Sequence, residues 1–469
     1  MAATIAWKVT SRLAFAASRL PRPLYFRLLS YVLQPALRWA RGDDSRPAAK
    51  NDRKTGESEN FRPAPQRPDP GEAVATGAGA ALLKAASPKR AVARALVVDG
   101  FTPTPDRDAA SGDIRWFMRI LSDLGYEVTF VPAFSTAHAG RYTHELESLG
   151  IICPVAPELT SARDFMLSHG GAFDLIALYR ITVAEGLIDV ARECAPNAKV
   201  ILNTVDLHFL RDQRQAELNG DLHAFVEAKQ REARELGVIR SADAAVLLSE
   251  FEYEYVGRHV PDAQRFFIPL AVEVPGRLAP YEGRAGVLFV GGFGHAPNVD
   301  AVRFLCGTIW PRVRAALPEA RLFVVGADPP AEVTAHHAPS DGIEMTGYVK
   351  DLHELYRTVR VAVAPLRFGA GLKGKVVASL AVGVPCVVTS IAGEGMPAGV
   401  TNAIAVTDDP EDFARAIVDI HANPERWLRM SDAGVAYARA NFSIETITAK
   451  VRELLESCGL PYDDTMRRG

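Results

Sequence analysis

The sequence predicts an α/β protein made of two Rossmann-like domains, each built on a parallel sheet. Short apolar runs, typical of buried strands, alternate with amphipathic helical stretches between Arg94 and Leu248. The same alternation restarts at Val287, after a proline-rich stretch from Phe266 to Pro280. A chain of 469 residues is also too long for one ordinary hydrophobic core and suits two domains with additional segments.

The composition indicates a globular protein of a reducing compartment. Hydrophobic residues make up 48% of the chain and charged residues 23%, and the net charge of -3 gives no general attraction to nucleic acid. The five cysteines form no C-x-x-C pair, which argues against structural zinc and against a disulfide framework. No apolar run reaches the roughly 18 residues that a membrane-spanning helix needs. We therefore expect a cytoplasmic protein that binds no nucleic acid.

The first 41 residues contain seven basic residues and no acidic one, with aromatic and aliphatic residues between them. The apolar runs are too short for the core of a signal peptide. A basic, aromatic helix suits an interfacial segment on anionic lipid, which would place the protein at the inner face of the membrane. A transit peptide, a helix that docks on a partner protein and a poorly ordered tail are the alternatives. Residues 42–90, which start with a stretch rich in proline and charge, predict a disordered linker.

The rest of the chain divides into a first domain (91–268), a crossover (269–285), a second domain (286–441) and a C-terminal helix and tail (442–469). In the first domain, the expected strands are 95–98, 128–131, 175–178, 200–202 and 244–248, and the expected helices include 113–124, 183–194 and 208–236. In such sheets, ligands bind beyond the carboxyl ends of the strands. Two of these ends carry polar residues.

The first of these ends continues into the loop P-T-P-D-R-D-A-A-S-G. Its residues Asp106, Arg107 and Asp108 are candidates for binding the sugar hydroxyls of an acceptor. Gly112, near a predicted helix start, offers backbone N–H groups to a phosphate. Pro and Asp are also ordinary turn residues, and Ser111 could simply cap the helix.

The second end continues into N-T-V-D-L-H, which places Asp206 two residues before His208 at a predicted helix start. The pair could position an acceptor hydroxyl or the oxygens of a donor sugar, so both are candidate catalytic residues. Asp206 could equally be a helix N-cap, which contributes about 1 kcal/mol. Both roles remain open.

Residues 361–396 of the second domain carry the strongest chemical signal in the chain. A short buried strand, 361–364, leads into the turn G-A-G-L-K-G-K and then into a small-residue helix, 375–382. This arrangement brings free backbone N–H groups and the positive end of a helix to one point, where Lys373 and Lys375 add full charge. Such a point attracts an anion, although glycine turns also serve close helix packing.

The stretch PLRFGAGLKGKVVASLAVGVP, with the EGM that follows it, resembles the donor-binding segment of group-1 (family 4-like) GT-B glycosyltransferases. The similarity is to a branch in which G-A-G-x-K-x-K replaces the commoner E-G-F-G. Similar family segments are P-T-P-D-R-D-A-x-S-G, D-L-H, the S-x-x-E of residues 249–252 and F-V-G-x-F-x-H-x-P-N. The resemblance runs from about residue 94 to 456 and is most specific over 286–396.

The resemblance implies two facing Rossmann-like domains, the first for the acceptor and the second for a nucleotide diphosphate sugar. The turn T-G-Y-V-K-D would contact the nucleotide base, and the terminal helix would cross back onto the first domain. The implied donor-binding residues are Gly112, Gly292, His295, Gly347, Tyr348, Val349, Arg367, Gly369, Gly371, Leu372, Lys373, Lys375, Ser379 and Glu394. Lys375 is also a candidate catalytic residue, because cations neutralise a leaving diphosphate. Retention of anomeric configuration is implied, without metal or cofactor.

The chain departs from the family at one point. The common E-x7-E pattern, whose second glutamate binds the donor ribose, corresponds here to Ala370 and Ala378. Ser379 is either a replacement or a helix residue that packs on a neighbour. The expected activity is sugar transfer to a sugar, lipid-linked or polysaccharide acceptor in cell-envelope synthesis. A catalytically silent scaffold or binding module and a nucleotide-sugar epimerase remain the alternatives.

Overall fold

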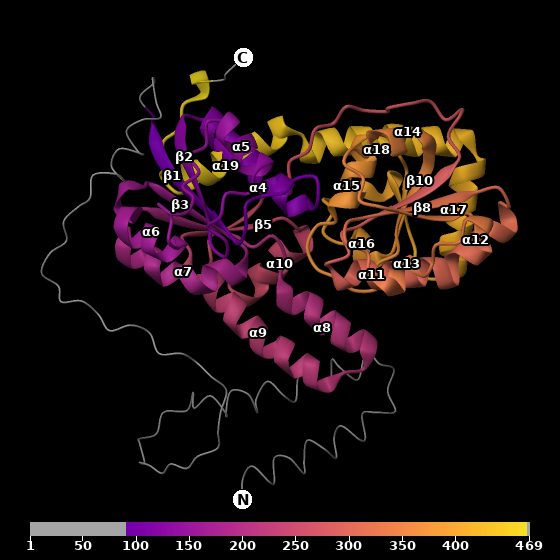
Figure 1. Cartoon of the computed structure of the whole chain (residues 1–469), viewed down its shortest axis with the longest axis horizontal. Helices are drawn as coiled ribbons and strands as arrows, with labels where there is room; N and C mark the ends of the chain where they lie inside the picture. The colour runs from indigo at the N-terminus through magenta and orange to yellow at the C-terminus, as the bar shows by residue number, and fades with distance from the viewer. Residues whose placement is uncertain (1–90, 467–469) are drawn as a thin grey trace, which may run out of the picture. The chain divides into compact units, whose positions relative to one another are not determined.

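The computed structural model describes residues 91–466, so the predicted basic segment 1–41 and linker 42–90 lie outside the described residues. Within this range, the chain forms two six-stranded sheets whose neighbouring strands are all parallel (Figure 1). Helices cover both faces of each sheet, as the mostly apolar strands require. The predicted fold class, two Rossmann-like domains with parallel sheets, is therefore confirmed.

The first sheet has the order β2-β1-β3-β4-β5-β6. Its strands are β1 (Ala93–Asp99), β2 (Tyr126–Pro132), β3 (Leu175–Tyr179), β4 (Lys199–Asn203), β5 (Ala244–Leu247) and β6 (Arg265–Phe267). The helices of this domain are α4 (Ala109–Asp123), α5 (Arg141–Ser148), α6 (Ala162–His169), α7 (Ile181–Cys194), α8 (His208–Asn219), α9 (Leu222–Ser241) and α10 (Glu250–His259). β6 was not predicted from the sequence, because it is an edge strand whose three residues are only half-buried.

The second sheet has the order β12-β11-β10-β7-β8-β9. Its strands are β7 (Gly286–Val290), β8 (Arg321–Val325), β9 (Ile343–Gly347), β10 (Val359–Ala364), β11 (Cys386–Val388) and β12 (Ile404–Val406). The helices of this domain include α11 (Ala296–Phe304), α12 (Trp310–Ala316), α13 (Ala331–Thr334), α14 (His353–Thr358), α15 (Gly374–Ala381), α16 (Ser390–Gly393) and α17 (Pro410–Ala422).

Each sheet has one point where the strand order reverses. In the first sheet, β1 lies between β2 and β3, and in the second, β7 lies between β8 and β10. Ligands of open parallel sheets bind beyond the strand ends at such points. The relevant positions are therefore the residues that follow β1 and β3 in the first domain and β7 and β10 in the second.

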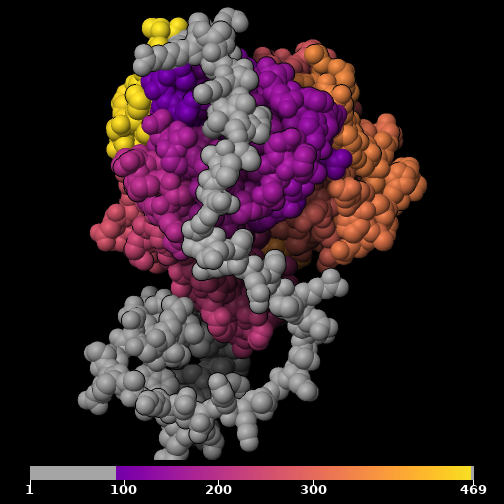
Figure 2. Space-filling model, turned by 60° about the vertical axis from the view of Figure 1, so that its left-hand side comes forward, coloured from indigo at the N-terminus to yellow at the C-terminus, as the bar shows by residue number. Residues whose placement is uncertain are grey.

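Two long helices expected from the sequence are interrupted. The predicted helix 208–236 is wrong at its centre, because α8 ends at Asn219 and α9 begins at Leu222, with Gly220 at φ +71 between them. The two helices form an antiparallel pair that stands out from the first domain (Figures 1 and 2). The helical stretch 299–317, which the alternating pattern of the second domain predicts as one helix, consists of α11, a π-helical turn over Leu305–Ile309, and α12. Pro311 lacks the N–H that a regular helix would use there.

The C-terminal helices connect the two domains. α18 (Pro424–Phe442) packs on α15 of the second domain, and α19 (Ile444–Ser457) packs on α4 of the first. The backbone N–H of Val272, in the crossover, donates to the carbonyl of Phe442 at 2.9 Å, so the two connections run side by side. The expected return of the terminal helix to the first domain is confirmed. None of the helices in residues 91–466 is long and apolar enough to cross a membrane.

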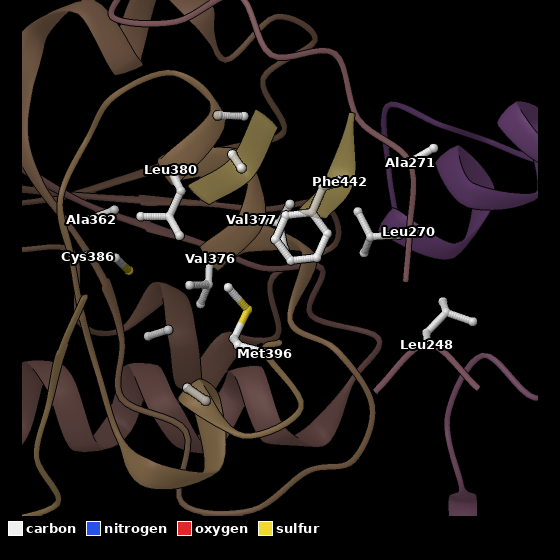
Figure 3. Packing of buried hydrophobic residues seen from close by; sticks show 14 of the residues in the cluster. Leu248, Leu270, Ala271, Ala362, Val376, Val377, Leu380, Cys386, Met396 and Phe442 are labelled. Carbon is white, nitrogen blue, oxygen red and sulfur yellow. The ribbon is translucent and has the colours of Figure 1, made fainter. Parts of the chain in front are cut away.

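A continuous apolar cluster packs against the buried face of α15. Val376 and Val377 of this helix are fully buried, and Phe442 lies between Val377 and Leu270 of the crossover (Figure 3). Leu248, the residue after β5, extends the same cluster into the first domain. The N-terminus of α15 is therefore held in place by packing against both domains.

Candidate functional site

The glycine-rich loop after β10 leads directly into the N-terminus of α15. Gly369 has φ +148 and Gly371 has φ +70, which are conformations that favour glycine. No side chain caps the helix, because Lys373 occupies the N-cap position and the first turn contains no acidic residue. The first N–H groups of α15 are therefore available to an anion.

Two lysines add positive charge at this helix terminus, where the helix dipole alone disfavours cations. Lys373 is 8% exposed, and its Nζ donates to the carbonyl oxygens of Ala370 (2.9 Å) and Gly371 (2.6 Å). The Nζ of Lys375 donates to Oδ1 of Asn298 at 2.5 Å. Burial lowers the pKa of Lys375 to about 7 and the pKa of Lys373 to about 8. Neither lysine forms an ion pair within residues 91–466, although the nearby carboxylates of Glu252 and Glu394 favour the charged form of Lys373.

The loop after β7 lies beside these lysines. Asn298 accepts from Lys375, and its Nδ2 donates to the carbonyl of Gly292 at 2.8 Å, so one amide connects the loop to the lysine. A Cβ at Gly291 would lie 2.7 Å from Cγ of Asn298 and 2.9 Å from the lysine Nζ, so a larger residue there would displace this pair. Partial desolvation lowers the pKa of His295, and the charges that act on it most, beginning with Asp206, belong to the first domain.

Asp206 and His208 lie close together at the start of α8. The Nε2 of His208 is 3.4 Å from Oδ1 of Asp206, and Arg211 donates to the other oxygen at 3.2 Å. Burial alone would raise the pKa of Asp206, but His208 and Arg211 outweigh it and lower the pKa to about 2. Asp206 is therefore an ionised carboxylate that holds the imidazole. It is not the N-cap suggested from the sequence, because α8 begins at His208 and Asp206 lies one residue before the N-cap position, with its two oxygens at His208 and Arg211.

Arg180 follows β3 at the reversal point of the first sheet. Its Nε donates to Oδ1 of the buried Asp99, the last residue of β1, at 2.8 Å. Burial raises the pKa of Asp99, while Arg180 acts in the opposite direction. Arg180 has φ +70, and Val205, just before Asp206, has φ +62. Such backbone strain in non-glycine residues is concentrated at functional sites.

The predicted acceptor-binding residues lie against the second domain. Asp106 accepts hydrogen bonds from Tyr348 and from Arg141 of α5, so a predicted acceptor residue contacts a predicted base-binding residue. Arg107 lies over the Tyr348 ring, with its guanidinium carbon 5.6 Å from the ring centre. Asp108 caps α4, because it accepts from the backbone N–H of Ser111 at 2.9 Å.

Three further donor-site predictions involve side chains that already have partners. Arg367 donates to Asp300 through two nitrogens, with its Nε at 2.8 Å. Glu394 accepts from Arg214 of α8 at 2.7 Å. Ser379 is fully buried, and its hydroxyl donates to the carbonyl of Val376 at 2.8 Å, which favours the helix-packing interpretation over a ribose contact.

The remaining predicted contacts are backbone or apolar positions. Gly112 lies inside the first turn of α4, whose N-terminus faces α15, since a Cβ at Gly374 would lie 2.4 Å from that of Ala109. Gly347, with φ +68, ends β9, and Val349 and Leu372 are half-buried. Their roles in donor binding stay predictions.

Four residues that shape the site were not assigned a role from the sequence. Arg180 directly follows β3, Asn298 lies in the first turn of α11, Arg214 lies within α8, and Glu252 lies in the first turn of α10. Arg180 could have been found from the sequence, because it is a polar residue directly after a buried strand. Asn298 and Arg214 had no such signal, because long-range packing brings them to the loop.

One group of possible metal ligands occurs in the described part of the chain. His138, His144 and Glu147 lie on the surface after β2, with ligand atoms within 4.8 Å of one another. The Nδ1 of His138 accepts from the backbone N–H of Gly140 at 3.0 Å, which leaves the hydrogen of a neutral ring on Nε2. Metal-binding histidines instead donate from their second nitrogen. These three residues are also separate from the loops described above.

The comparisons with known proteins agree with this geometry. Residues 284–423 match the family described as Glycosyl transferases group 1. This segment contains the loops after β7 and β10 and the helix α15. No curated protein matches the sequence.

Several solved structures share the fold. Sucrose-phosphate synthase from Thermosynechococcus elongatus is 15% identical with a TM-score of 0.59, over 78% of this chain and 99% of that protein. HepE of Anabaena in complex with UDP-glucose is 12% identical with a TM-score of 0.58, over 78% and 100%. Trehalose 6-phosphate synthase from Burkholderia multivorans is 11% identical with a TM-score of 0.54, over 79% and 97%. The fold is that of the GT-B glycosyltransferases.

Proposed function

We propose that this protein is a glycosyltransferase that moves a sugar from a nucleotide diphosphate sugar to an acceptor hydroxyl. The observation that carries the proposal is the uncapped N-terminus of α15, where two lysines without carboxylate partners lie inside the segment that matches group 1 glycosyl transferases. The proposal includes family 4 membership, transfer of a hexose with retention of configuration, no metal requirement, and an acceptor from cell-envelope polysaccharide or glycolipid synthesis. HepE, which binds UDP-glucose and shares the fold, supports a nucleotide-sugar donor.

The proposed sugar transfer depends on the charges at the N-terminus of α15 and on the Asp206–His208 pair. The leaving diphosphate would bind at the N-terminus of α15, where backbone N–H groups, Lys373 and Lys375 neutralise the charge that develops as the glycosidic bond breaks. His208, oriented by the ionised Asp206, belongs to the first-domain loop that contacts Gly371 and would position the acceptor hydroxyl or the oxygens of the donor sugar. No residue is assigned as a covalent nucleophile.

A thermal-shift screen with UDP-, GDP- and ADP-sugars is the first test. A ligand at about 100 times its Kd stabilises the folded protein by about 2.7 kcal/mol, which is a readily measured shift in Tm. Release of the nucleotide from the stabilising donor, with and without oligosaccharide or lipid-linked acceptors, then tests transfer. Conversion of one UDP-sugar into another would instead identify an epimerase, and stabilisation without any turnover would identify a silent scaffold.

The scaffold alternative rests on the two alanines, and Ala378→Glu tests it. Ala378 is half-buried and the hydroxyl of its neighbour Ser379 donates to a backbone carbonyl, so we expect other groups, such as backbone atoms, to hold the ribose. We expect Ala378→Glu to change donor affinity by less than about tenfold, whereas a restored charged hydrogen bond would give roughly 10- to 100-fold. A gain of that size, in a protein with no transferase activity on any donor, would favour a decayed site over the proposed enzyme.

Donor binding is expected to weaken as the pH rises from 6 to 8.5. The pKa of Lys375 is lowered to about 7 and that of Lys373 to about 8, so both lose their charge across this range in the free protein. An anion binds the protonated forms, and the affinity should fall by up to about tenfold per pH unit for each group above its pKa. A UDP-sugar is a suitable probe, because its diphosphate is diesterified and does not titrate here. Calorimetry in buffers of different ionisation enthalpy should show proton uptake, and a pH-independent Kd would contradict the prediction.

We also propose that residues 1–41 attach the protein to the inner face of the membrane. Each basic residue near an anionic surface contributes about 1 kcal/mol, so the seven in this segment suffice even if only some engage. Deletion of residues 1–75 should leave a folded protein whose binding to phosphatidylserine vesicles at low salt is reduced by at least about tenfold. Equal vesicle binding by the full-length and truncated proteins would remove this part of the proposal.

A further inference from the structure

One carboxylate oxygen of Glu252 connects the loop after β4, which carries Asp206, with the glycine-rich loop after β10. It lies in the first turn of α10 and is fully buried. Its Oε1 accepts from the backbone N–H of Leu207, between Asp206 and His208, at 3.0 Å. The same oxygen accepts from the backbone N–H of Gly371, in the glycine-rich loop of the second domain, at 2.8 Å. One atom therefore binds the backbone of both loops.

The packing around this contact is tight. A Cβ at Gly371 would lie 2.8 Å from the Cβ of Asp206, so the glycine-rich loop touches the loop that carries Asp206. The second oxygen of Glu252, Oε2, is buried and has no hydrogen-bond partner within residues 91–466. Burial raises the pKa of Glu252 to about 7, an effect to which Asp206 adds. A buried acid with an unsatisfied oxygen costs stability, so such groups are retained where they fix a specific arrangement.

A second contact joins the same two elements. Arg214, within the helix α8 that begins at His208, donates from NH1 to the carbonyl of Gly369 at 2.7 Å. Its NH2 donates to Glu394. The glycine-rich loop is therefore bound to the first domain at Gly369 and at Gly371, on either side of Ala370.

We propose that Glu252 is a positioning residue that fixes the glycine-rich loop against the Asp206–His208 pair. It sets the separation between the cationic end of α15 and the imidazole, two groups that belong to different domains. The catalytic consequence rests on the proposed function, whereas the link between the loops does not. If the two domains separate, Gly371 leaves the carboxylate while Leu207 remains bound, so the order of the glycine-rich loop depends on domain closure.

Hydrogen exchange of the full-length protein measures the link directly, with Glu235 as a matched control. Glu235 is 1% exposed, its Oε1 accepts from the backbone N–H of Phe209 at 3.2 Å, and its Oε2 has no described partner. It thus matches Glu252 in burial and chemistry but contacts only the first domain. Glu252→Ala should speed exchange of the Gly371 and Leu207 amides by about 10- to 100-fold, the value of a hydrogen bond to a charged group. Glu235→Ala should speed exchange at Phe209 and leave Gly371 unchanged.

Two outcomes would overturn the link: unchanged exchange at Gly371 in Glu252→Ala, or an equal increase in Glu235→Ala. If Glu252→Ala does not fold, Glu252→Asp replaces it, because the shorter side chain cannot reach both amides. Glu252→Gln keeps an acceptor oxygen at the same length and should retain most of the protection at Gly371. If the Gly371 amide exchanged as fast in Glu252→Gln as in a folded Glu252→Ala, that result would also contradict the proposal.

Kinetics test the catalytic consequence. Glu252→Ala should lower the kcat of transfer by at least about tenfold, while the Kd of inorganic pyrophosphate, which probes the anion site without a base or sugar, changes less than kcat. An unchanged kcat with a released Gly371 amide would refute the positioning role. If the wild-type protein transfers no sugar from any donor but the exchange result holds, the proposed function fails and the link between the loops stands.

Discussion

Lys375→Ala is expected to abolish sugar transfer while leaving the fold intact. The lysine lies at the N-terminus of α15 with Asn298 as its hydrogen-bond partner, where the leaving diphosphate of the proposed reaction would bind. Removal of one preorganised donor from such a position lowers kcat by about 10²- to 10³-fold. Lys373→Ala should weaken donor binding in the same direction. The measurement is kcat and KM with the donor identified by thermal shift, together with pyrophosphate affinity.

The matched control is Lys199→Ala. Lys199 begins β4 and so lies at the amino end of the first sheet, opposite to the edge where ligands bind. This variant removes one lysine charge without touching the loops, and its activity should equal that of the wild type. Wild-type affinity and turnover in both Lys375→Ala and Lys373→Ala would place the phosphate site elsewhere.

The stability of a Lys375 variant distinguishes loss of function from loss of the fold. Burial lowers the pKa of Lys375 to about 7 from an ordinary 10.5, so between these values the unfolded chain binds a proton that the folded protein does not. This lysine therefore makes the folded state less favourable, and its contribution to stability rises with pH across that window. Lys375→Met should consequently be at least as stable as the wild type at pH 7 to 8 while binding is lost. A functional residue that costs stability is expected to behave in this way.

The parts of the site that could be predicted from the sequence are those encoded by neighbouring residues. The loop that contains Lys373 and Lys375 was predicted because strand, glycine turn and helix follow one another within about fifteen residues. The pair Asp206 and His208 was predicted for the same reason, and the structure shows that the two side chains do meet. Whether Asp206 caps α8 could not be decided from the sequence, because Arg211, one turn away, competes for its carboxylate. Which partner the carboxylate takes depends on burial.

The parts that could not be predicted depend on contacts across long stretches of chain. Glu252 meets Gly371 over a separation of 119 residues, and Arg214 meets Gly369 over 155. Ser379 was a reasonable substitute for a lost carboxylate by position alone. Only the structure shows that its hydroxyl faces its own helix and bonds to Val376.

Gly371→Ala is expected to lower kcat by about a hundredfold. Gly371 has φ +70, and a Cβ there would lie 2.8 Å from the Cβ of Asp206 and 3.3 Å from the carbonyl oxygen of Val205. Both neighbours belong to a strained segment of the first domain, so the glycine-rich loop must move away from it. A displacement of about 1 Å between reacting groups costs roughly 10²-fold in rate. The loop would also lose its hydrogen bond to Glu252, while the first turn of α15, the proposed anion site, stays in the second domain.

Backbone strain and steric contact are separated by Gly399→Ala. Gly399 has φ +96, and a Cβ there would meet no atom within 4 Å, so this variant introduces the strain of a left-handed alanine without a collision. That strain costs about 1–2 kcal/mol in either variant, and the collision in Gly371→Ala should lower its Tm further. Only Gly371→Ala should lower kcat, with pyrophosphate affinity changed much less than the rate. Equal kcat in the two variants would mean that contact between the glycine-rich loop and Asp206 is not needed for transfer. In that case, the lysines of α15 would act without a fixed distance to the Asp206–His208 pair.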